Sequence, residues 1–359
     1  MKKIKAYICL LLAFIIALCI GSIAYAEPLN SSGFEVHFIN VGQGDSALIL
    51  CDGHAMLIDG GEKGNSDLLY SYLKEHGVQE LDYIVCSHPH KDHIGGLAGA
   101  LNYAKVQMAF CPVKKYDSKG FENFKKYLDK QGVSITVPEA GDVFPLGSAV
   151  CTVLGPVNAA KGNNNSLVIR IEYGDTSFLF SGDAEYEEEH DILAIGYELK
   201  STVLKVGHHG SEDATSYQYL YEVSPQYAVI SVGDDNSYNH PNENTLSRLR
   251  DADVTVYRTD LSGTVICRSD GKAVTFYPEK GNNLNAFQTA GENSITRSIL
   301  PEADKNSGCD YILNTNTHKF HYPKCGSVKK MKEENKEYYT GDRADVIARG
   351  YSPCGNCKP

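Results

Sequence analysis

The sequence predicts an α/β fold between residues 33 and 280, in which short strands alternate with helices. Two patterns indicate this fold: apolar runs of strand length recur along the region with glycine or asparagine between them, and segments with helical apolar spacing separate many of them. The composition agrees, because 42% of the 359 residues are hydrophobic and 22% are charged. Such values are typical of a globular protein and exclude a disordered one.

The strands are expected to begin as a meander of three short runs at 34–39, 46–50 and 55–59. A buried strand at 81–86 then ends at a cluster of histidines. Later runs with the length and apolar content of strands lie at 149–154, 166–173, 176–181, 202–206, 227–232 and 264–268. Apolar spacing predicts helices near 68–73, 121–131, 184–196, 215–223 and 243–251.

Residues 1–26 have the pattern of a cleaved secretory signal. A lysine-rich start precedes an apolar run from Ala6 to Ile20, and the small residues Ala24 and Ala26 form an Ala-x-Ala cleavage site. An uncleaved anchor is the alternative. We therefore expect an exported protein, secreted or retained at the cell surface, with no transmembrane domain in the mature chain.

The character of the chain changes near residue 281. The stretch 281–308 is polar and lacks apolar periodicity, which predicts a linker, whereas 309–359 returns to structured spacing as a separate module. The formal net charge of −11 argues against a protein that holds DNA by bulk positive charge. It does not exclude an enzyme that handles nucleic acid through metal ions. Beyond residue 26, lysine and arginine outnumber the acids in the C-terminal module, with nine against six in residues 309–359.

Three histidines and an aspartate follow the predicted strand at 81–86 within six positions. They are His88, His90, Asp92 and His93. Imidazoles and a carboxylate on one turn suit two adjacent divalent ions with nitrogen and oxygen ligands. The alternative is a polar loop in which the histidines fall by chance.

His88-x-His90-x-Asp92-His93, together with Asp59-Gly60-Gly61, resembles the metallo-β-lactamase superfamily, whose fold is an αββα sandwich. Four further segments are similar to the hydrolase domain of the ComEC/Rec2 competence proteins, at 38–46, 164–168, 180–184 and 205–211. The resemblance covers about 33–280, and it implies a hydrolase domain there.

The resemblance also implies roles for particular residues. His88 and His90 would hold one metal ion, and Asp92 and His93 would hold a second. Asp183 would bridge the two, and His240 would complete the second site. Asp92, His208 and His209 are the catalytic candidates, because either histidine can supply a ligand or a proton donor. Asp59 would orient the ligand histidines; Asp45 would do the same or serve as a turn residue.

One segment departs from the pattern of the superfamily, in which many members carry another ligand histidine before the strand that precedes the bridging aspartate. Residues 161–166 contain no histidine here. An amide oxygen from Asn164 or Asn165 would be a weaker ligand, so one metal site is expected to be looser than the other. Zinc is the expected metal and manganese the alternative.

Four residues near the C-terminus have zinc-site spacing: His321, Cys325, Cys354 and Cys357. The segment is similar to the zinc module of the Ada DNA-repair protein, with His321 in place of the first cysteine, and a structural zinc ion is expected. The alternative is a disulfide between Cys354 and Cys357 or with Cys309. Five other cysteines lie in strand-like runs and are expected to be buried hydrophobic residues: Cys51, Cys86, Cys111, Cys151 and Cys267.

The sequence therefore predicts an exported, metal-dependent phosphodiesterase that acts on DNA, or on another phosphodiester, through a metal-bridged hydroxide. A phosphorylcholine esterase acting on cell-wall polymers is an alternative enzyme. A non-catalytic protein that binds nucleic acid or cell wall is an alternative of a different class. Hydrolysis of β-lactams is a fourth and weaker alternative.

Overall fold

The computed structural model describes residues 33–158, 162–234, 236–281, 286–287, 311–341, 343–354 and 357. The predicted secretory signal at 1–26 and most of the predicted linker at 281–308 lie outside the described residues. Within the described part of the chain, no helix combines the length and the apolar character needed to cross a membrane.

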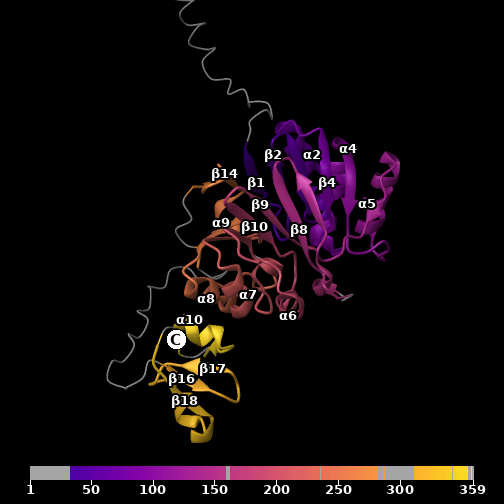
Figure 1. Ribbon diagram of the computed structural model, residues 1–359. Coiled ribbons are helices and arrows are strands. Elements are labelled where there is room, and N and C mark those ends of the chain that lie inside the picture. The colour runs from indigo at the N-terminus through magenta and orange to yellow at the C-terminus, as the bar shows by residue number, and fades with distance from the viewer. Residues whose placement is uncertain are drawn as a thin grey trace, which may run out of the picture.

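Two β-sheets form the centre of the molecule (Figure 1). The first has eight strands in the order β15-β14-β1-β2-β3-β4-β5-β6. Its members are β1 (Phe34–Phe38), β2 (Ala47–Cys51), β3 (His54–Ile58), β4 (Glu80–Val85), β5 (Lys105–Phe110), β6 (Ile135–Thr136), β14 (Val265–Ser269) and β15 (Val274–Pro278).

The second sheet has seven strands in the order β13-β12-β11-β10-β9-β8-β7. Its members are β7 (Val143–Leu146), β8 (Ala149–Gly155), β9 (Val168–Tyr173), β10 (Thr176–Phe180), β11 (Val203–Lys205), β12 (Tyr227–Ile230) and β13 (Thr255–Arg258). Strands β10 to β13 run parallel to one another, as do β3 to β6 in the first sheet.

The two sheets pack against each other through a common apolar core. Alternate residues of β1 point into it, among them Phe34 and Phe38, which stack on Phe178 and Phe180 of the second sheet. Both faces of the first sheet are buried, as two neighbouring residues of β2 show. Ile49 joins the core between the sheets, whereas Leu48 packs in the core under the covering helices.

Helices cover the outer face of each sheet, which completes an αββα sandwich (Figure 1). The eight-stranded sheet is covered by α2 (Ser66–Glu75), α4 (Leu97–Tyr103) and α5 (Lys119–Gln131). The seven-stranded sheet is covered by α6 (Tyr186–Ile195), α7 (Tyr217–Val223) and α8 (Glu243–Asp251). Two short helices, α3 (Lys91–Ile94) and α9 (Thr259–Ser262), follow strand ends. The predicted fold class is confirmed.

The C-terminal residues form a four-stranded sheet in the order β18-β16-β17-β19. Its elements are β16 (Tyr311–Asn314), β17 (Lys319–His321), β18 (Lys336–Tyr339), β19 (Ser352–Pro353) and the helix α10 (Arg343–Ala348). We call residues 311–357 of this unit the C-terminal module. An ion pair of 2.5 Å between Arg343 and Asp251 connects the module to α8.

The sequence located every helix longer than seven residues in the described chain, but it missed several elements. In the sandwich it missed the strands β5, β6, β7, β13 and β15 and the short helices α3, α4 and α9, and it predicted no individual element of the C-terminal module. Strand β5 illustrates why a strand was missed. Lys105, Gln107 and Met108 are exposed, so the buried apolar residues of β5 do not form a continuous run in the sequence. The five cysteines expected as buried hydrophobic residues are confirmed as free and buried.

Candidate metal centre

The predicted site residues follow the carboxyl ends of parallel strands in both sheets. Asp59 follows β3, and the histidine cluster follows β4. Asp183 follows β10, and His208 and His209 follow β11. Because parallel strands end at the same edge of a sheet, and the two sheets face each other, these side chains converge on one place.

Asp59 fixes the orientation of His93 directly and that of His88 through Ser87. Its Oδ2 accepts a hydrogen bond from Nδ1 of His93 at 2.9 Å, and both of its oxygens accept from Ser87, through the backbone N–H at 2.7 Å and the hydroxyl at 2.6 Å. The same hydroxyl lies 3.2 Å from Nδ1 of His88. Each ring is therefore held through Nδ1, which leaves Nε2 as the free nitrogen.

His209 is held in the same way from the other sheet. Its Nδ1 donates to the backbone carbonyl of Ser231 at 3.0 Å and lies 3.1 Å from Oδ1 of Asp45. The other oxygen of Asp45 forms an ion pair of 2.8 Å with Lys205, which is itself buried. Nε2 of His209 is thus also the free nitrogen of its ring.

The free nitrogens face Asp183, which is 2% exposed. Oδ2 of Asp183 lies 3.1 Å from Nε2 of His93, 3.6 Å from Nε2 of His88 and 3.7 Å from Nε2 of His209. None of these three nitrogens makes a hydrogen bond, and neither does Oδ1 of Asp183, although all four atoms are buried. Buried polar atoms without partners are costly, so their convergence indicates a missing ligand.

The electrostatics agree with a site built for cations. Burial tends to raise the pKa of Asp183, but the surrounding histidines outweigh it and hold that pKa well below its usual value. Burial tends to lower the pKa of His209, yet Asp183 and Asp45 outweigh it and raise that pKa to about 10. For His88, burial dominates and lowers the pKa. The pocket therefore stabilises positive charge next to Asp183.

One ligand atom from each of four residues lies within 4.8 Å of the other three: Asp92, His93, Asp183 and His209. This set combines two imidazoles with two carboxylates, a donor set that zinc and manganese both accept. His88 and His90 lie on its other side, with ring centroids 4.6 Å apart. The donors fit two neighbouring divalent ions, with His88 and His90 on one side and Asp92, His93 and His209 on the other.

His209 lies beside Asp92 and Asp183, with its Nε2 3.4 and 3.7 Å from their Oδ2 atoms. His240, which the resemblance assigned to the second metal site, has its ring centroid 5.4 Å from that of His208 and 6.3 Å from that of His209. It lines the same cavity, and its buried Nδ1 has no hydrogen-bond partner.

The asparagine segment also differs in detail. Oδ1 of Asn164 accepts hydrogen bonds from backbone N–H groups at the start of α6, at 3.0 and 3.4 Å, and Asn165 is not among the residues that line the cavity. Asn163 lines it instead, and its buried Oδ1 has no hydrogen-bond partner. Asn163 is therefore the residue of this segment whose side chain reaches the cavity, since Asn164 is bonded to the start of the helix.

His208 occupies a different environment from His209. Its side chain is 21% exposed, and Nδ1 lies 3.3 Å from Glu185 and 3.6 Å from Asp213. Both histidines have positive φ angles, 47° and 53°. Backbone in this region is strained for residues other than glycine, and such strain concentrates at functional sites. The turn thereby points two adjacent imidazoles into one site.

An open cavity of about 440 Å³ gives access to the centre. Its floor carries Asp92, Asp183 and the histidines, while Tyr116 and Tyr238 stand in its walls. Both tyrosines are exposed, by 40% and 55%. The sequence analysis assigned no role to either residue, and their positions in loops gave no pattern that would have revealed them.

A second group of candidate ligands lies in the C-terminal module: His321, Cys325, Cys354 and Cys357. The Sγ atoms of Cys325 and Cys354 are 3.9 Å apart. Two thiolates on a tetrahedral zinc ion are separated by about 3.8 Å. Nδ1 of His321 is buried without a hydrogen-bond partner. These residues therefore fit one tetrahedral zinc ion without an open position.

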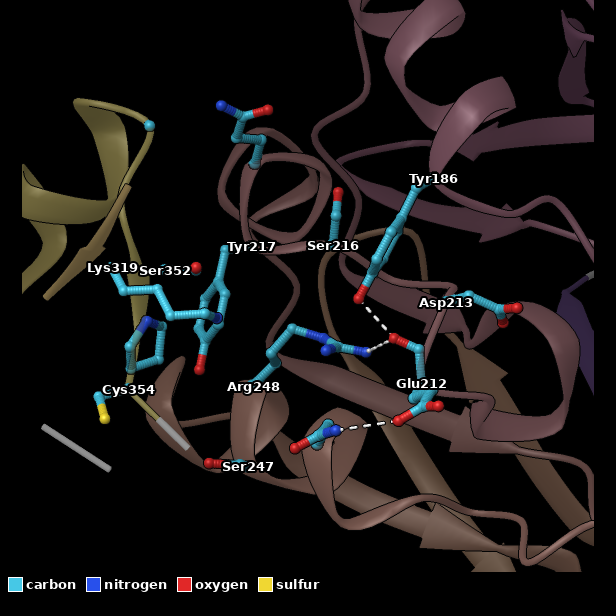
Figure 2. Close-up of a pocket in the computed structure, with 14 residues that line it drawn as sticks. Tyr186, Glu212, Asp213, Ser216, Tyr217, Ser247, Arg248, Lys319, Ser352 and Cys354 are labelled. Atoms are coloured by element: carbon cyan, nitrogen blue, oxygen red, sulfur yellow. Dashed lines mark hydrogen bonds between the residues drawn. The ribbon is translucent and has the colours of Figure 1, made fainter. Parts of the chain in front are cut away.

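A cleft of about 540 Å³ separates the C-terminal module from helices α7 and α8 (Figure 2). Lys319 and Ser352 line it from the module, and Tyr186, Tyr217 and Arg248 line it from the sandwich. Arg248 is not free for a ligand, because it donates to the backbone carbonyls of residues 212, 214 and 215. The loop that carries Asp213 forms the boundary between this cleft and His208.

The fold and the donor set define a metallohydrolase-type αββα protein. Residues 39–234 match the metallo-beta-lactamase superfamily, and the chain belongs to that superfamily.

Two curated relatives match most of this chain. ComE operon protein 3 of Bacillus subtilis is 31% identical over an alignment of 276 positions that covers 71% of this chain and 36% of that protein. Recombination protein 2 of Haemophilus influenzae is 31% identical over an alignment of 261 positions that covers 70% of this chain and 31% of that protein. The chain thus spans about a third of the length of these relatives.

A solved structure with a similar fold is the metallo-beta-lactamase fold protein YhfI from Bacillus subtilis. It aligns with a TM-score of 0.47 and 15% sequence identity, over 66% of this chain and 100% of that chain.

Proposed function

We propose that this protein is an exported, two-metal phosphodiesterase that cleaves DNA. The observation that carries the proposal is the convergence of buried, unpaired ligand atoms from His88, His93 and His209 on Asp183, which lines an open cavity together with His209. A purely structural metal site would be closed, whereas a catalytic one keeps a side open to substrate.

The metal ions, when bound, would lower the pKa of a shared water molecule and stabilise the attacking and leaving oxygens of a phosphodiester. The side chains have separate tasks. His88 and His90 would hold one ion, Asp92, His93 and His209 would hold the other, and Asp183 lies between these two sets of residues. Asp59 and Asp45 hold the ligand rings in place. His208, the more exposed imidazole of its pair, is the group that can give a proton to the leaving oxygen.

DNA is the proposed substrate for two reasons. The relatives include proteins named for competence and recombination, which are processes that act on DNA. In addition, the C-terminal module carries an excess of lysine and arginine beside an otherwise acidic chain. The role of the module in this proposal is to hold substrate phosphates near the centre, and its own zinc ion is structural.

The test is hydrolysis by the purified protein, loaded with zinc or manganese, on single-stranded DNA, double-stranded DNA and p-nitrophenyl phosphorylcholine. The proposal expects metal-dependent cleavage of DNA that EDTA abolishes. Turnover of the phosphorylcholine ester without cleavage of DNA would instead identify a phosphorylcholine esterase. Binding of DNA with no hydrolysis of any phosphodiester would indicate a non-catalytic protein.

A further inference from the structure

Two exposed aromatic rings stand at the walls of an otherwise polar cavity. Tyr116 lies in the loop after β5, and Tyr238 lies in the loop after β12. Large apolar side chains at a cavity wall are retained against the cost of exposure when a ligand covers them. Within the described residues, neither ring hydroxyl has a hydrogen bond that accounts for its position.

The rings rest on histidines from opposite sides of the centre. The ring centroid of Tyr116 is 6.3 Å from that of His90, and the ring centroid of Tyr238 is 5.8 Å from that of His240, with an interplanar angle of 29°. His90 belongs to the first sheet and His240 to the second. No ring contact joins Tyr116 to Tyr238, although the structure describes both residues. Two separate flat surfaces therefore flank Asp183.

This arrangement matches the geometry of a phosphodiester. In a two-metal displacement the attacking and leaving oxygens lie in line, so the two arms of the substrate leave the phosphorus in different directions. The nucleotide on each side of the phosphorus would then lie next to one of the two tyrosines. A nucleobase stacks on an aromatic side chain whatever its sequence, and such stacking is how proteins hold single strands. An aromatic cage for a quaternary ammonium group instead places several rings around a single point.

We propose that Tyr116 and Tyr238 are substrate-binding residues that each stack on a nucleobase, one on either side of the scissile phosphate, and that the substrate is therefore a single-stranded polynucleotide. This inference rests on the proposed phosphodiesterase function and specifies its substrate. Double-stranded DNA would be a poor substrate, because its bases are already stacked on each other. Lys91, whose ammonium group forms an ion pair of 2.7 Å with Glu62 at the surface, lines the same wall beside the path of the backbone.

The test uses pairs of ligands that share a backbone and differ in their bases. A thymidine dodecamer and an abasic dodecamer are compared as substrates, and their hydrolysis-resistant phosphorothioate forms are compared in equilibrium binding by fluorescence anisotropy. The full-length, metal-loaded protein is used throughout. Tyr116→Ala and Tyr238→Ala remove the rings, Tyr116→Phe and Tyr238→Phe keep them, and Tyr221→Ala is the matched control, since Tyr221 is 50% exposed and does not line the cavity.

Each alanine variant is expected to weaken binding of the thymidine oligomer and raise its KM by about 5- to 150-fold, with little change in kcat. The phenylalanine variants and the control should bind as the natural protein does, and binding of the abasic oligomer should not respond to any of these changes. A merely structural role would lower the affinity for both oligomers equally.

Other outcomes distinguish a failure of the base-stacking proposal from a failure of the proposed phosphodiesterase function. If the protein hydrolyses bis-p-nitrophenyl phosphate but binds the thymidine and abasic oligomers equally well, the phosphodiesterase proposal stands and the stacking proposal is wrong. If the alanine variants instead lose turnover of p-nitrophenyl phosphorylcholine, the tyrosines bind a choline group. If no phosphodiester is hydrolysed, the function fails, and the binding data alone decide whether the rings hold bases.

Discussion

Nδ1 of His93 donates a hydrogen bond of 2.9 Å to Oδ2 of Asp59, and both side chains are almost completely buried. The pair joins the loop after β4 to the end of β3. It selects the tautomer in which Nε2 of His93 faces Asp183 with a free lone pair. The orientation of the His93 ring is therefore set by its hydrogen bond to Asp59 and does not depend on a metal ion.

Loss of a bridging or terminal ligand should abolish activity. Asp183→Ala and His90→Ala are each expected to reduce metal-dependent hydrolysis of DNA by more than tenfold, because Asp183 lies between the two sets of ligands and His90 belongs to one of them. Initial rates at saturating metal provide the measurement, and circular dichroism checks that the variants are folded. If both variants retained more than about a tenth of the rate, the two-metal mechanism would be wrong.

The two metal sites should differ in affinity. Asp92, His93, Asp183 and His209 form a group of four candidate ligands, whereas His88 and His90 share Asp183 with that group and have the amide side chain of Asn163 in the same cavity. Calorimetric titration of the metal-free protein with zinc should show one tight and one weaker event. Asn163→His supplies an imidazole and should tighten the weaker event, by about 10- to 100-fold if the ring reaches the ion. Two equally tight sites in the natural protein would contradict this interpretation.

The buried ion pair between Lys205 and Asp45 should be needed for stability. Both side chains are less than a tenth exposed, and the carboxyl group is 2.8 Å from the ammonium group. Asp45→Asn leaves Lys205 buried without its counter-charge, which is expected to lower the free energy of unfolding by about 3–5 kcal/mol. Urea denaturation of the metal-free protein measures this change, and the double variant Asp45→Asn, Lys205→Met should recover part of the loss.

The same pair predicts a dependence of stability on pH. Burial tends to raise the pKa of Asp45, but Lys205 and His209 together outweigh it and lower that pKa to about 2, from 3.8 in the unfolded chain. Since the folded pKa is the lower one, the stabilisation is fully present above pH 3.8 and is lost as the pH falls towards 2. The difference in unfolding free energy between the natural protein and the double variant should therefore shrink over that interval. A constant difference would mean that the carboxyl group is not paired as described.

The C-terminal module should require zinc to fold. Its small core includes Leu313, Phe320 and Val346, and the cysteine cluster must supply the remaining stability. The fragment 309–359 is expected to gain circular-dichroism signal only when zinc is added, and Cys325→Ser should prevent this gain. The same substitution in the full chain should leave hydrolysis of bis-p-nitrophenyl phosphate unchanged. A mass that indicates a Cys354–Cys357 disulfide without zinc would support the disulfide alternative instead.

The module should also contribute to substrate affinity through charge. Removing residues 282–359 deletes Lys319 and the other lysines of the module, so binding of DNA should weaken mainly at low salt, with little change in kcat at saturation. Binding isotherms at 50 and at about 200 mM salt provide the measurement. As a narrower control, Lys319→Gln should give a smaller effect of the same sign. An unchanged salt dependence after truncation would rule out this role.

The sequence alone determined the fold class and one half of the metal centre. Strand and helix periodicity is local, and His88, His90, Asp92 and His93 lie within six positions, so a single loop brings them together. Their proximity needs no knowledge of the rest of the chain. The buried cysteines were also predictable, because each lies in an apolar run.

Only the tertiary structure decided how the other half of the centre is arranged. The placement of His209 beside Asp92, and of Asn163 rather than Asn165 at the cavity, depends on where loops from two different sheets point their side chains. The pairing of Asp45 with Lys205 likewise joins distant segments. Spacing along the sequence indicates neighbours within one turn or one strand, whereas these contacts are set by the packing of the two sheets. For that reason the distances of Asp183 and His209 from the histidine loop, and the tyrosines that line the same cavity, became visible only in the folded chain.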